Sequence, residues 1–404
     1  MKFIKIDVYI RDPKMVSPKE AVMMQSGLDD VVAAHTVLSE VDGAAGRLVI
    51  RGAALDALVR ASAFEDVLHR LFEGFFDGLP DVHTLAQLLG QARAEVFAGL
   101  PCADDPIFKM TPIEAMRALI ARIADGDDLA TALRLVAAPA VFTAAVSRVR
   151  QGRPTLAPDA SSTHAADVLR MSGLASTPAQ ARALDCYLIT VADHGLNAST
   201  FASRVVASTH AGLTSSVLAA LSALKGPLHG GAPGPVLDML DAIGRSDNAG
   251  PWLEMALARG DRLMGFGHRI YRVRDPRADA LKGALMTLAQ AGGGASIRLA
   301  LALAVEHAAL ELLRRKKPGR PLQTNVEFYT ALLLDALGFD RDSFTCVFAM
   351  GRVMGWLAHA REQVLTGRLI RPQSVYIGPV PAPATPEPLL AARPVAPLLA
   401  ENSA

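Results

Sequence analysis

Apolar side chains recur every three or four residues along most of the chain, and this spacing predicts α-helices. The segment from Thr111 is typical, because Thr111 and Glu114 form a capping-box pattern and Pro112 occupies the first helical position. Thr177 opens another helix with the same signals. Further helices are expected over residues 54–74, 199–224, 233–244, 275–291, 296–315, 325–337 and 341–366. Residues 1–10 alternate partly and allow a short strand, but no convincing strand pair follows, so the fold class expected is all-α.

The composition agrees with a helical protein. Hydrophobic residues make up 51% of the chain and aromatic residues only 5%, so Ala, Leu and Val must fill most of the core. Ala and Leu are strong helix formers. Gly351 and Gly355 lie four residues apart within the last helical pattern, and we interpret them as sites of close helix packing. The proline-rich stretch from Pro379 to Pro397 cannot continue as a helix.

Charge and cysteine usage exclude several classes of protein. Lys and Arg total 41 against 40 for Asp and Glu, a net charge of +1, which is not typical of a general nucleic-acid or anionic-membrane binder. The longest apolar run, Leu135 to Val146, is shorter than the roughly 20 residues of a membrane span. Three widely spaced cysteines predict neither a disulfide framework nor a zinc site. Charges interrupt the first residues, unlike a signal peptide, so a cytoplasmic location is expected.

Three histidines lie in unusual surroundings. There is no P-loop, HExxH motif or G-x-S-x-G elbow, and the glycine pattern at Gly265 and Gly267 lacks the third glycine of a dinucleotide site. His194 lies in Ala-Asp-His-Gly-Leu-Asn, whereas His229 and His268 are flanked by glycines, which let the backbone approach a ligand closely. Such histidines can act as electrophiles or acid–base groups. The other histidines are interpreted as structural, and they are His35, His69, His83, His164, His210, His307 and His359.

Arginines supply a second indication of chemistry. Several follow His268 closely and two more lie late in the chain; they are Arg272, Arg274, Arg277, Arg352 and Arg371. The guanidinium group binds carboxylates through a two-pronged hydrogen bond. Arginines concentrated beside such histidines, in a chain that is otherwise neutral, predict a small polycarboxylate substrate.

In these segments the chain resembles the citrate synthase family. The matching stretches, in order, are Val41-Asp-Gly through Arg51-Gly, Ala192-Asp-His194 through Thr200, Lys225 through Ala232, Gly265 through Arg277, Asn325-Val-Glu327-Phe-Tyr, and Arg371-Pro-Gln-Ser-Val-Tyr-Ile-Gly-Pro. Together they cover roughly residues 27–379, so the first 26 residues and the proline-rich tail lie outside the resemblance. The ordered combination is far more specific than any single stretch.

The resemblance implies an almost wholly α-helical homodimer. Each chain would have a large domain, residues 1–230 and 338–404, and a small mobile domain, residues 231–337, that closes over the substrate. The family condenses acetyl-CoA with oxaloacetate to give citrate and CoA, a step of the tricarboxylic acid cycle. It needs no metal or redox cofactor.

The resemblance also assigns roles to individual residues. Glu327 would take a proton from the thioester methyl group, His229 would hydrogen-bond the thioester oxygen, and His268 would polarise the ketone of oxaloacetate. The residues implied in oxaloacetate binding are His194, Asn197, Arg277 and Arg352, together with Arg371 reaching from the partner subunit. Arg272 would contact a CoA phosphate, and Arg320 is a second candidate for that contact.

Two positions depart from the family pattern. The usual base is Asp, whereas this chain has Glu327, which is longer by one methylene or roughly 1 Å; a misplacement of that order can cost about a hundredfold in rate. Either the site is re-spaced to suit Glu, or the activity is low or altered in substrate. Gly195 is the second departure, since the family often has Glu there.

Two alternative functions stay open from the sequence. One is a 2-methylcitrate synthase, because one extra methylene in propionyl-CoA is discriminated only about 10- to 200-fold by an apolar pocket. The other is a family-derived binding or regulatory protein whose catalysis is weakened by Glu327. A hydrolase that uses His229 in an oxyanion loop is excluded by the lack of a nucleophile elbow.

Overall fold

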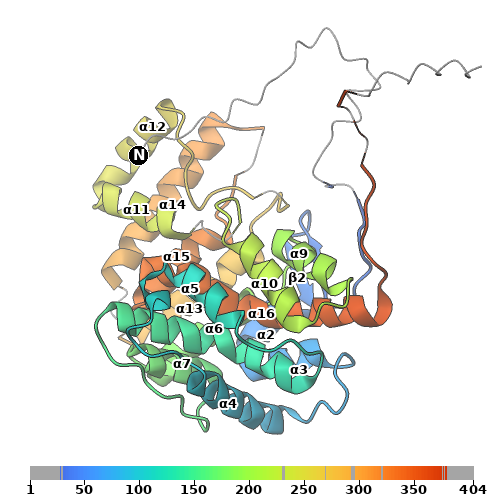
Figure 1. Cartoon of the computed structure of the whole chain (residues 1–404). Helices are drawn as coiled ribbons and strands as arrows, with labels where there is room; N and C mark the ends of the chain where they lie inside the picture. Colours follow the sequence, from blue (N-terminus) through green and yellow to red (C-terminus); the bar gives the residue numbers. More distant parts are fainter. Residues whose placement is uncertain are drawn as a thin grey trace, which may run out of the picture. The chain divides into compact units, whose positions relative to one another are not determined.

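Helices dominate the computed structural model, as the periodic pattern predicts (Figure 1). The structure describes residues 28, 31–229, 233–268, 270–292, 296–319, 322–374, 376 and 378–379, so the possible strand within residues 1–10 lies outside it. The helices of the first half are α2 (Leu55–Ala61), α3 (Phe64–Phe72), α4 (Val82–Ala98), α5 (Pro112–Ile120), α6 (Leu129–Arg150), α7 (His164–Ser172), α8 (Pro178–Thr190) and α9 (Ala198–Ala207). Those of the second half are α10 (Leu213–Leu224), α11 (Pro233–Ile243), α12 (Ala249–Ala258), α13 (Pro276–Gln290), α14 (Ser296–Lys316), α15 (Val326–Leu337) and α16 (Phe344–Thr366). Short 3₁₀ turns cover Pro106–Lys109, Ser246–Asn248 and Arg341–Ser343.

Local signals set the start of α8 as the sequence predicts, whereas at the start of α5 the Thr111 hydroxyl donates to Glu114 and makes no cap hydrogen bond to the backbone. The Thr177 side chain accepts a hydrogen bond from the backbone of Gln180, and the Gln180 side chain accepts one from the backbone of Thr177. This capping box, followed by Pro178 at the first helical position, begins α8 as predicted.

Two stretches predicted as single helices are each divided in two. Residues 54–74 break at Ser62, where Arg182 donates to the carbonyl of Ser62 and Asp185 accepts the backbone N–H of Phe64. Residues 199–224 break after α9, where His210 and Gly212 adopt φ values of 59° and 94°. The first break is held by side chains from α8, so the local pattern could not reveal it.

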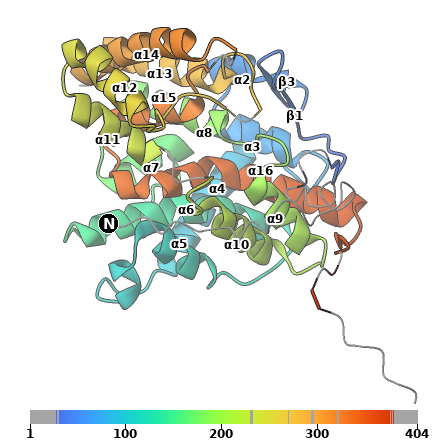
Figure 2. The same ribbon diagram turned by 90° about the horizontal axis from the view of Figure 1, so that it is seen from above.

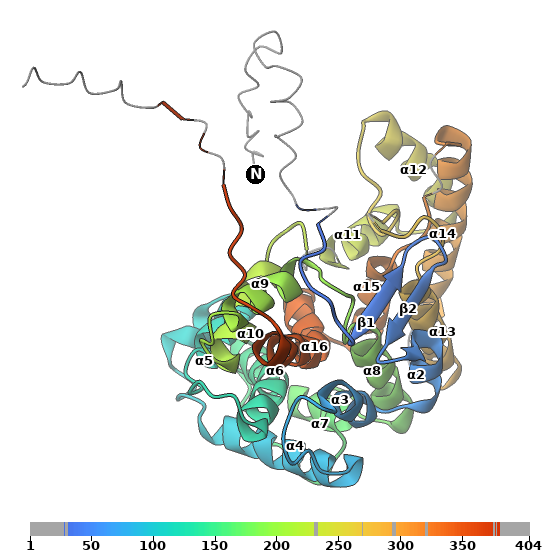
Figure 3. The same cartoon turned by 90° about the vertical axis from the view of Figure 1, so that its right-hand side faces the viewer.

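The expectation of no strand pair is wrong. A small antiparallel sheet is formed by β1 (Ser39–Asp42), β2 (Arg47–Ile50) and β3 (Ala53–Ala54) (Figure 3). Asp42 closes the first turn by accepting the backbone N–H groups of Ala44 and Ala45. These strands are too short to show a period of two. The hairpin tip reaches the chain after His268, since the carbonyl of Gly43 accepts the N–H of Arg272.

The long helix α16, from late in the chain, passes through the middle of the helices of the first half (Figure 2). Gly351 and Gly355 let it touch α8 and the turn after it: a Cβ on Gly355 would lie 2.2 Å from the carbonyl oxygen of Ala192, and one on Gly351 would lie 2.7 Å from that of Leu188. The interpretation of close helix packing is confirmed. Helix α6 has the length and apolar composition of a membrane span, but 83% of that stretch is buried among the other helices, as in the core of a globular protein.

Helices α11 to α15 gather at one end of this bundle (Figures 1 and 2). Within the group, α12 packs on α14, and α15 packs on both α11 and α13, while α13 also packs on α8. The predicted small domain, residues 231–337, spans this group, and its mobility stays a prediction. The chain divides by contacts into residues 1–370 and a second unit, residues 371–404, within which the hydroxyl of Tyr376 donates to the carbonyl of Pro379.

Candidate active site

His194 lies in the turn after α8, and its ring is buried. Its Nε2 is 3.1 Å from the hydroxyl of Tyr271, and its ring meets that of His268 edge-on, with the centroids 5.9 Å apart. Burial, reinforced by the nearby cations Arg277 and Arg352, lowers the pKa of His194 well below its usual value. The ring is therefore neutral near pH 7.

His268 presents one N–H group to the same space. Its Nδ1 accepts the backbone N–H groups of Ile270 and Tyr271, both at 3.0 Å, so the neutral ring carries its proton on Nε2. That Nε2 is 3.1 Å from Nη2 of Arg277. A guanidinium can only donate, so this contact brings two donors together. Burial, together with Arg277, lowers the pKa of His268 to about 4. Both donors are thus available to an oxygen atom placed between them.

Asp275 orients Arg277 and the start of α15 with one buried carboxylate. It accepts from Nε and Nη2 of Arg277 at 3.0 and 2.9 Å, and from the backbone N–H of Val326 at 3.2 Å. Burial by itself would lower the pKa of Arg277, but the Asp275 carboxylate raises it, so the guanidinium stays charged. It also lies over the ring of Tyr271, 5.6 Å from the centroid.

Arg352 enters the site from the buried middle of α16. Its Nε donates to the carbonyl of Val191, and its guanidinium lies 4.9 Å from the centre of the Phe348 ring. Phe348 in turn meets the ring of His229 edge-on, at 6.4 Å between centroids. Burial, together with Arg352, lowers the pKa of the half-buried His229 to about 4, so this ring too is neutral.

Ser199, at the start of α9, connects His229 to the interior. Its Oγ is 2.8 Å from Nε2 of His229 and accepts the Nε1–H of Trp356 at 3.1 Å. Asn197 caps α9, because its Oδ1 accepts the backbone N–H groups of Ser199 and Thr200. The Ser199 hydroxyl also lies 2.8 Å from Oδ1 of Asn197 and can donate to it. Since that oxygen already accepts two backbone N–H groups, whereas Nε2 of His229 has no other donor among the described residues, the arrangement favours donation of the Ser199 proton to Nε2 of His229. The proton of the neutral ring would then lie on Nδ1.

Glu327 occupies the first turn of α15. Asn325 caps this helix by accepting the N–H of Glu327 at 3.0 Å. The same Asn325 donates from Nδ2 to the carbonyl of Gly267 at 2.8 Å, and its N–H donates to the carbonyl of Gly265 at 2.9 Å. These hydrogen bonds therefore join the glycine-rich turn before His268 to the start of α15.

The environment of the Glu327 carboxyl group suits a base. Burial raises its pKa to about 7; Arg277 and Arg352 oppose this rise, and Asp275 adds to it. A carboxyl group whose pKa lies near the working pH is ionised in a large fraction of the molecules. When ionised, it also binds a proton more strongly than a carboxylate of ordinary pKa does. These surroundings come from α13 and α16 rather than from the neighbours of Glu327 in sequence.

Most of the residues predicted for the site belong to this assembly. Contacts and mutual electrostatic effects connect His194, His229, His268, Arg277, Glu327 and Arg352. Asn197 uses its side chain within its own loop, and the side chain of Arg272 is exposed. Arg320 lies outside the described residues, and Arg371 begins the second unit.

Tyr271, Asp275 and Ser199 have no predicted role, although all three lie in the stretches that carry the resemblance. Asp275 could have been found, because an Asp directly before Pro276 is a helix N-cap signal beside an arginine. The contacts of Tyr271 and Ser199 join distant segments and have no local signal.

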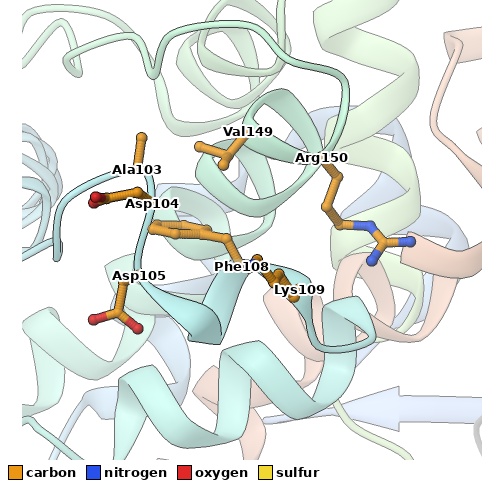
Figure 4. Close-up of a pocket in the computed structure, with 7 residues that line it drawn as sticks. All are labelled: Ala103, Asp104, Asp105, Phe108, Lys109, Val149 and Arg150. Atoms are coloured by element: carbon orange, nitrogen blue, oxygen red, sulfur yellow. The ribbon is translucent and has the colours of Figure 1, made fainter.

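A metal site, or a separate cavity that could bind a ligand, would be a second candidate site among the described residues. No group of three or more His, Cys, Asp or Glu residues in the described part of the chain could hold a metal ion. A cavity of about 410 Å³ is lined by Ala103, Asp104, Asp105, Phe108, Lys109, Val149 and Arg150 (Figure 4). None of the predicted site residues lines this cavity, and Arg150 is already bonded to Asp342 and to the carbonyl of Met110.

Comparison with known proteins gives consistent similarities. The family model described as citrate synthase, C-terminal domain, matches residues 27–373. A citrate synthase of Acidithiobacillus ferridurans is 35% identical, covering 87% of this chain and 95% of the relative. Citrate synthase 1 of Mycobacterium tuberculosis is 37% identical, covering 87% and 86%. The structure of citrate synthase from Thermoplasma acidophilum in a ternary complex with carboxymethyl coenzyme A and oxaloacetate superposes with a TM-score of 0.77 at 28% identity, covering 89% of this chain and 98% of that one.

Proposed function

The chain belongs to the citrate synthase family, and on that premise we propose that it condenses acetyl-CoA with oxaloacetate to give citrate and free CoA. The observation that supports this most directly is the convergence of three neutral histidines, two buried arginines and a carboxyl group with a pKa of about 7. The ligands of the Thermoplasma acidophilum complex are consistent with these two substrates.

Oxaloacetate would bind between the loops of His194 and His268. The cations Arg277 and Arg352 would hold its two carboxylates, with His194 completing the contact. The ketone oxygen would lie beside Nε2–H of His268, in the position where two donors now approach each other. Bound oxaloacetate would supply the acceptor that both donors lack, and its ketone carbon would become more electrophilic.

The thioester methyl group is a weak carbon acid, so its ionisation needs a base and a donor together. Glu327 would take the methyl proton, and Nδ1–H of His229 would donate to the thioester oxygen as the enolate forms. The enolate carbon would then attack the ketone carbon, and the alkoxide would be stabilised by His268. Water would finally cleave the citryl thioester to citrate and CoA. These steps need no metal ion or redox cofactor.

Two features of the family complete the proposal. Arg371 would reach the oxaloacetate site of a partner subunit in a homodimer. The small domain, residues 231–337, would close over bound substrate and exclude water until hydrolysis. Arg272, with an exposed side chain, would contact a CoA phosphate.

The test is release of CoA by the purified protein from acetyl-CoA plus oxaloacetate, with propionyl-CoA run in parallel. We expect acetyl-CoA to give the higher kcat/KM; a higher value for propionyl-CoA would reassign the protein to 2-methylcitrate synthesis. Glu327→Gln should reduce kcat by about 10²- to 10⁴-fold without loss of oxaloacetate binding. Absence of CoA release by the wild type with either thioester would overturn the proposal. Glu327→Asp then tests the reach of the base, since a loss of rate shows a site built around Glu.

A further inference from the structure

Behind His194, three buried side chains form a chain of hydrogen bonds that the proposed reaction does not use. We propose that Asp193, His359 and Arg204, called the relay below, position two oxaloacetate-binding elements at once: the loop of His194 and the segment that leads into Arg371. The proposal rests on the function proposed above, because it assumes that both elements bind oxaloacetate.

Each link of the relay is short and buried. Nε2 of His359 is 3.1 Å from Oδ2 of Asp193, and Nδ1 of the same ring is 2.8 Å from Nη1 of Arg204. Arg204 also donates to Glu362 at 2.6 Å and to Gln363 at 3.0 Å. All five side chains are buried, and they come from the turn after α8, from α9 and from α16.

The direction of the hydrogen bonds in the relay is fixed by chemistry. A guanidinium group only donates, so Nδ1 of His359 accepts from Arg204. The ring must then carry its proton on Nε2 and donate it to Asp193, which accepts as a carboxylate. The Asp193 charge also acts on the site itself: burial lowers the pKa of Arg352 to about 10, and the Asp193 carboxylate opposes that effect.

One arm of the relay holds the substrate-binding loop. His194 directly follows Asp193, so a displaced Asp193 carboxylate would displace His194 as well. The neighbouring Gly195 donates its N–H to Oγ of Ser39 at 2.9 Å, and Val37 donates its N–H to Glu362 at 2.9 Å. The strand that begins at Ser39 therefore joins the same network from the other side.

The other arm holds the segment before Arg371. Gln363, which accepts from Arg204, donates from Nε2 to the carbonyl of Arg368 at 2.9 Å. The N–H of Ile370 donates to Oγ of Ser208 at 3.0 Å, and Ser208 caps the helix that carries Arg204. Residues 368–370 are thus attached to α9 and α16, directly before the arginine proposed to enter the partner's site.

The first arm is tested by two substitutions of His359. Gln can donate from Nε2 and accept at Oε1, whereas Asn is one methylene shorter and cannot make both contacts. We expect His359→Asn to raise KM for oxaloacetate about 10- to 100-fold while KM for acetyl-CoA stays unchanged. With His359→Gln, KM for oxaloacetate should stay much closer to the wild-type value. His164→Leu is the matched control, because that ring is equally buried but its nitrogens have no hydrogen-bond partner among the described residues.

The control should change thermal stability and leave KM for oxaloacetate unchanged. The first arm is refuted if folded His359→Asn keeps the wild-type KM for oxaloacetate, or if it raises KM for acetyl-CoA by the same factor as KM for oxaloacetate. Thermal unfolding of each variant separates a loss of positioning from a loss of fold, and His359→Gln stays informative even if His359→Asn unfolds.

The second arm is tested in mixed dimers. A dimer of Arg371→Ala and His194→Ala chains should recover one intact site if Arg371 acts across the interface. Adding His359→Asn to the His194→Ala chain should give less recovery, because the Arg371 supplied by that chain is no longer held in place. Equal recovery would refute the second arm. No recovery in the first pair would refute the action of Arg371 across the interface, and with it the second arm, while the KM test still judges the first.

Discussion

The chemistry of the proposed reaction depends most on the protonation of one carboxyl group. Glu327 has its pKa raised to about 7 by burial, whereas the proposed donors His229 and His268 have values of about 4. The two kinds of group therefore titrate in separate ranges. Near neutral pH the histidines are neutral donors, and only the base changes its charge.

This separation predicts the acid side of the pH profile. The base must be ionised to accept the methyl proton, so kcat/KM should fall as the pH drops through about 7 and level off above it. The measurement is kcat/KM for acetyl-CoA from about pH 5 to about pH 9. A midpoint near 4.5, the ordinary value for a Glu side chain, would contradict the role of burial.

Two buried tyrosines should respond in opposite ways to loss of the hydroxyl. The hydroxyl of Tyr187 has no hydrogen-bond partner in the described part of the chain, whereas that of Tyr329 donates to Glu306 at 2.5 Å. An unpaired buried hydroxyl carries a desolvation cost, so Tyr187→Phe should raise the free energy of unfolding by about 1 kcal/mol. Tyr329→Phe should lower it by about 2 kcal/mol, because a hydrogen bond to a charged group is lost. Denaturant unfolding measures both, and destabilisation by Tyr187→Phe would show that its hydroxyl is paired.

At the scale of the helices, α16 packs closely against the turn after α8, which carries His194. The Cβ of an alanine at position 355 would lie 2.2 Å from the carbonyl oxygen of Ala192, two residues before His194. Gly355→Ala should therefore lower the free energy of unfolding by about 3 kcal/mol and raise KM for oxaloacetate. Gly283→Ala is the control: it lies in α13 with nothing within 4 Å of the added atom, and it should stabilise the protein by about 0.5–1 kcal/mol. Equal effects of the two substitutions on unfolding would contradict the packing argument.

Helix starts illustrate what the local sequence can specify. Thr177 and Gln180 cap each other, so the start of α8 was predictable from four residues. The end of α2 at Ser62 was not, because it depends on Arg182 and Asp185 from α8. The three short strands were also missed, and the tip of their hairpin is fixed by the chain after His268.

For the chain as a whole, the boundary between its two units lies directly before Arg371. The family model ends at residue 373, so it includes Arg371 and leaves out the proline-rich tail. A chain that ends at Pro379 should therefore keep the kcat/KM of the full protein. A chain that ends at Ile370 should raise KM for oxaloacetate roughly 10- to 100-fold, since it lacks one charged hydrogen-bond donor to a carboxylate. Steady-state kinetics of both chains give the comparison, and an unchanged KM in the shorter one would remove Arg371 from the site.

The sequence showed which chemical groups belong to the site, but it did not show which of them contact one another. Glycines beside His229 and His268, and arginines near His268, indicated a polycarboxylate site. His359 was interpreted as structural, because nothing near it in sequence shows that its ring lies between Asp193 and Arg204. The same is true of Asp275, whose carboxylate orients both Arg277 and the first turn of α15.

By itself the sequence determined the helical class, through its three-to-four-residue period, and the membership of the family, through ordered motifs. Only the tertiary structure decided the protonation of the site, because burial and the charges of Arg277 and Arg352 act through space between segments far apart in the chain. The hydrogen-bonding partners that fix the ring protons of His268 and His359 likewise come from folding. A periodic pattern specifies which face of a helix is buried; it does not specify which charges and hydrogen-bonding groups meet there.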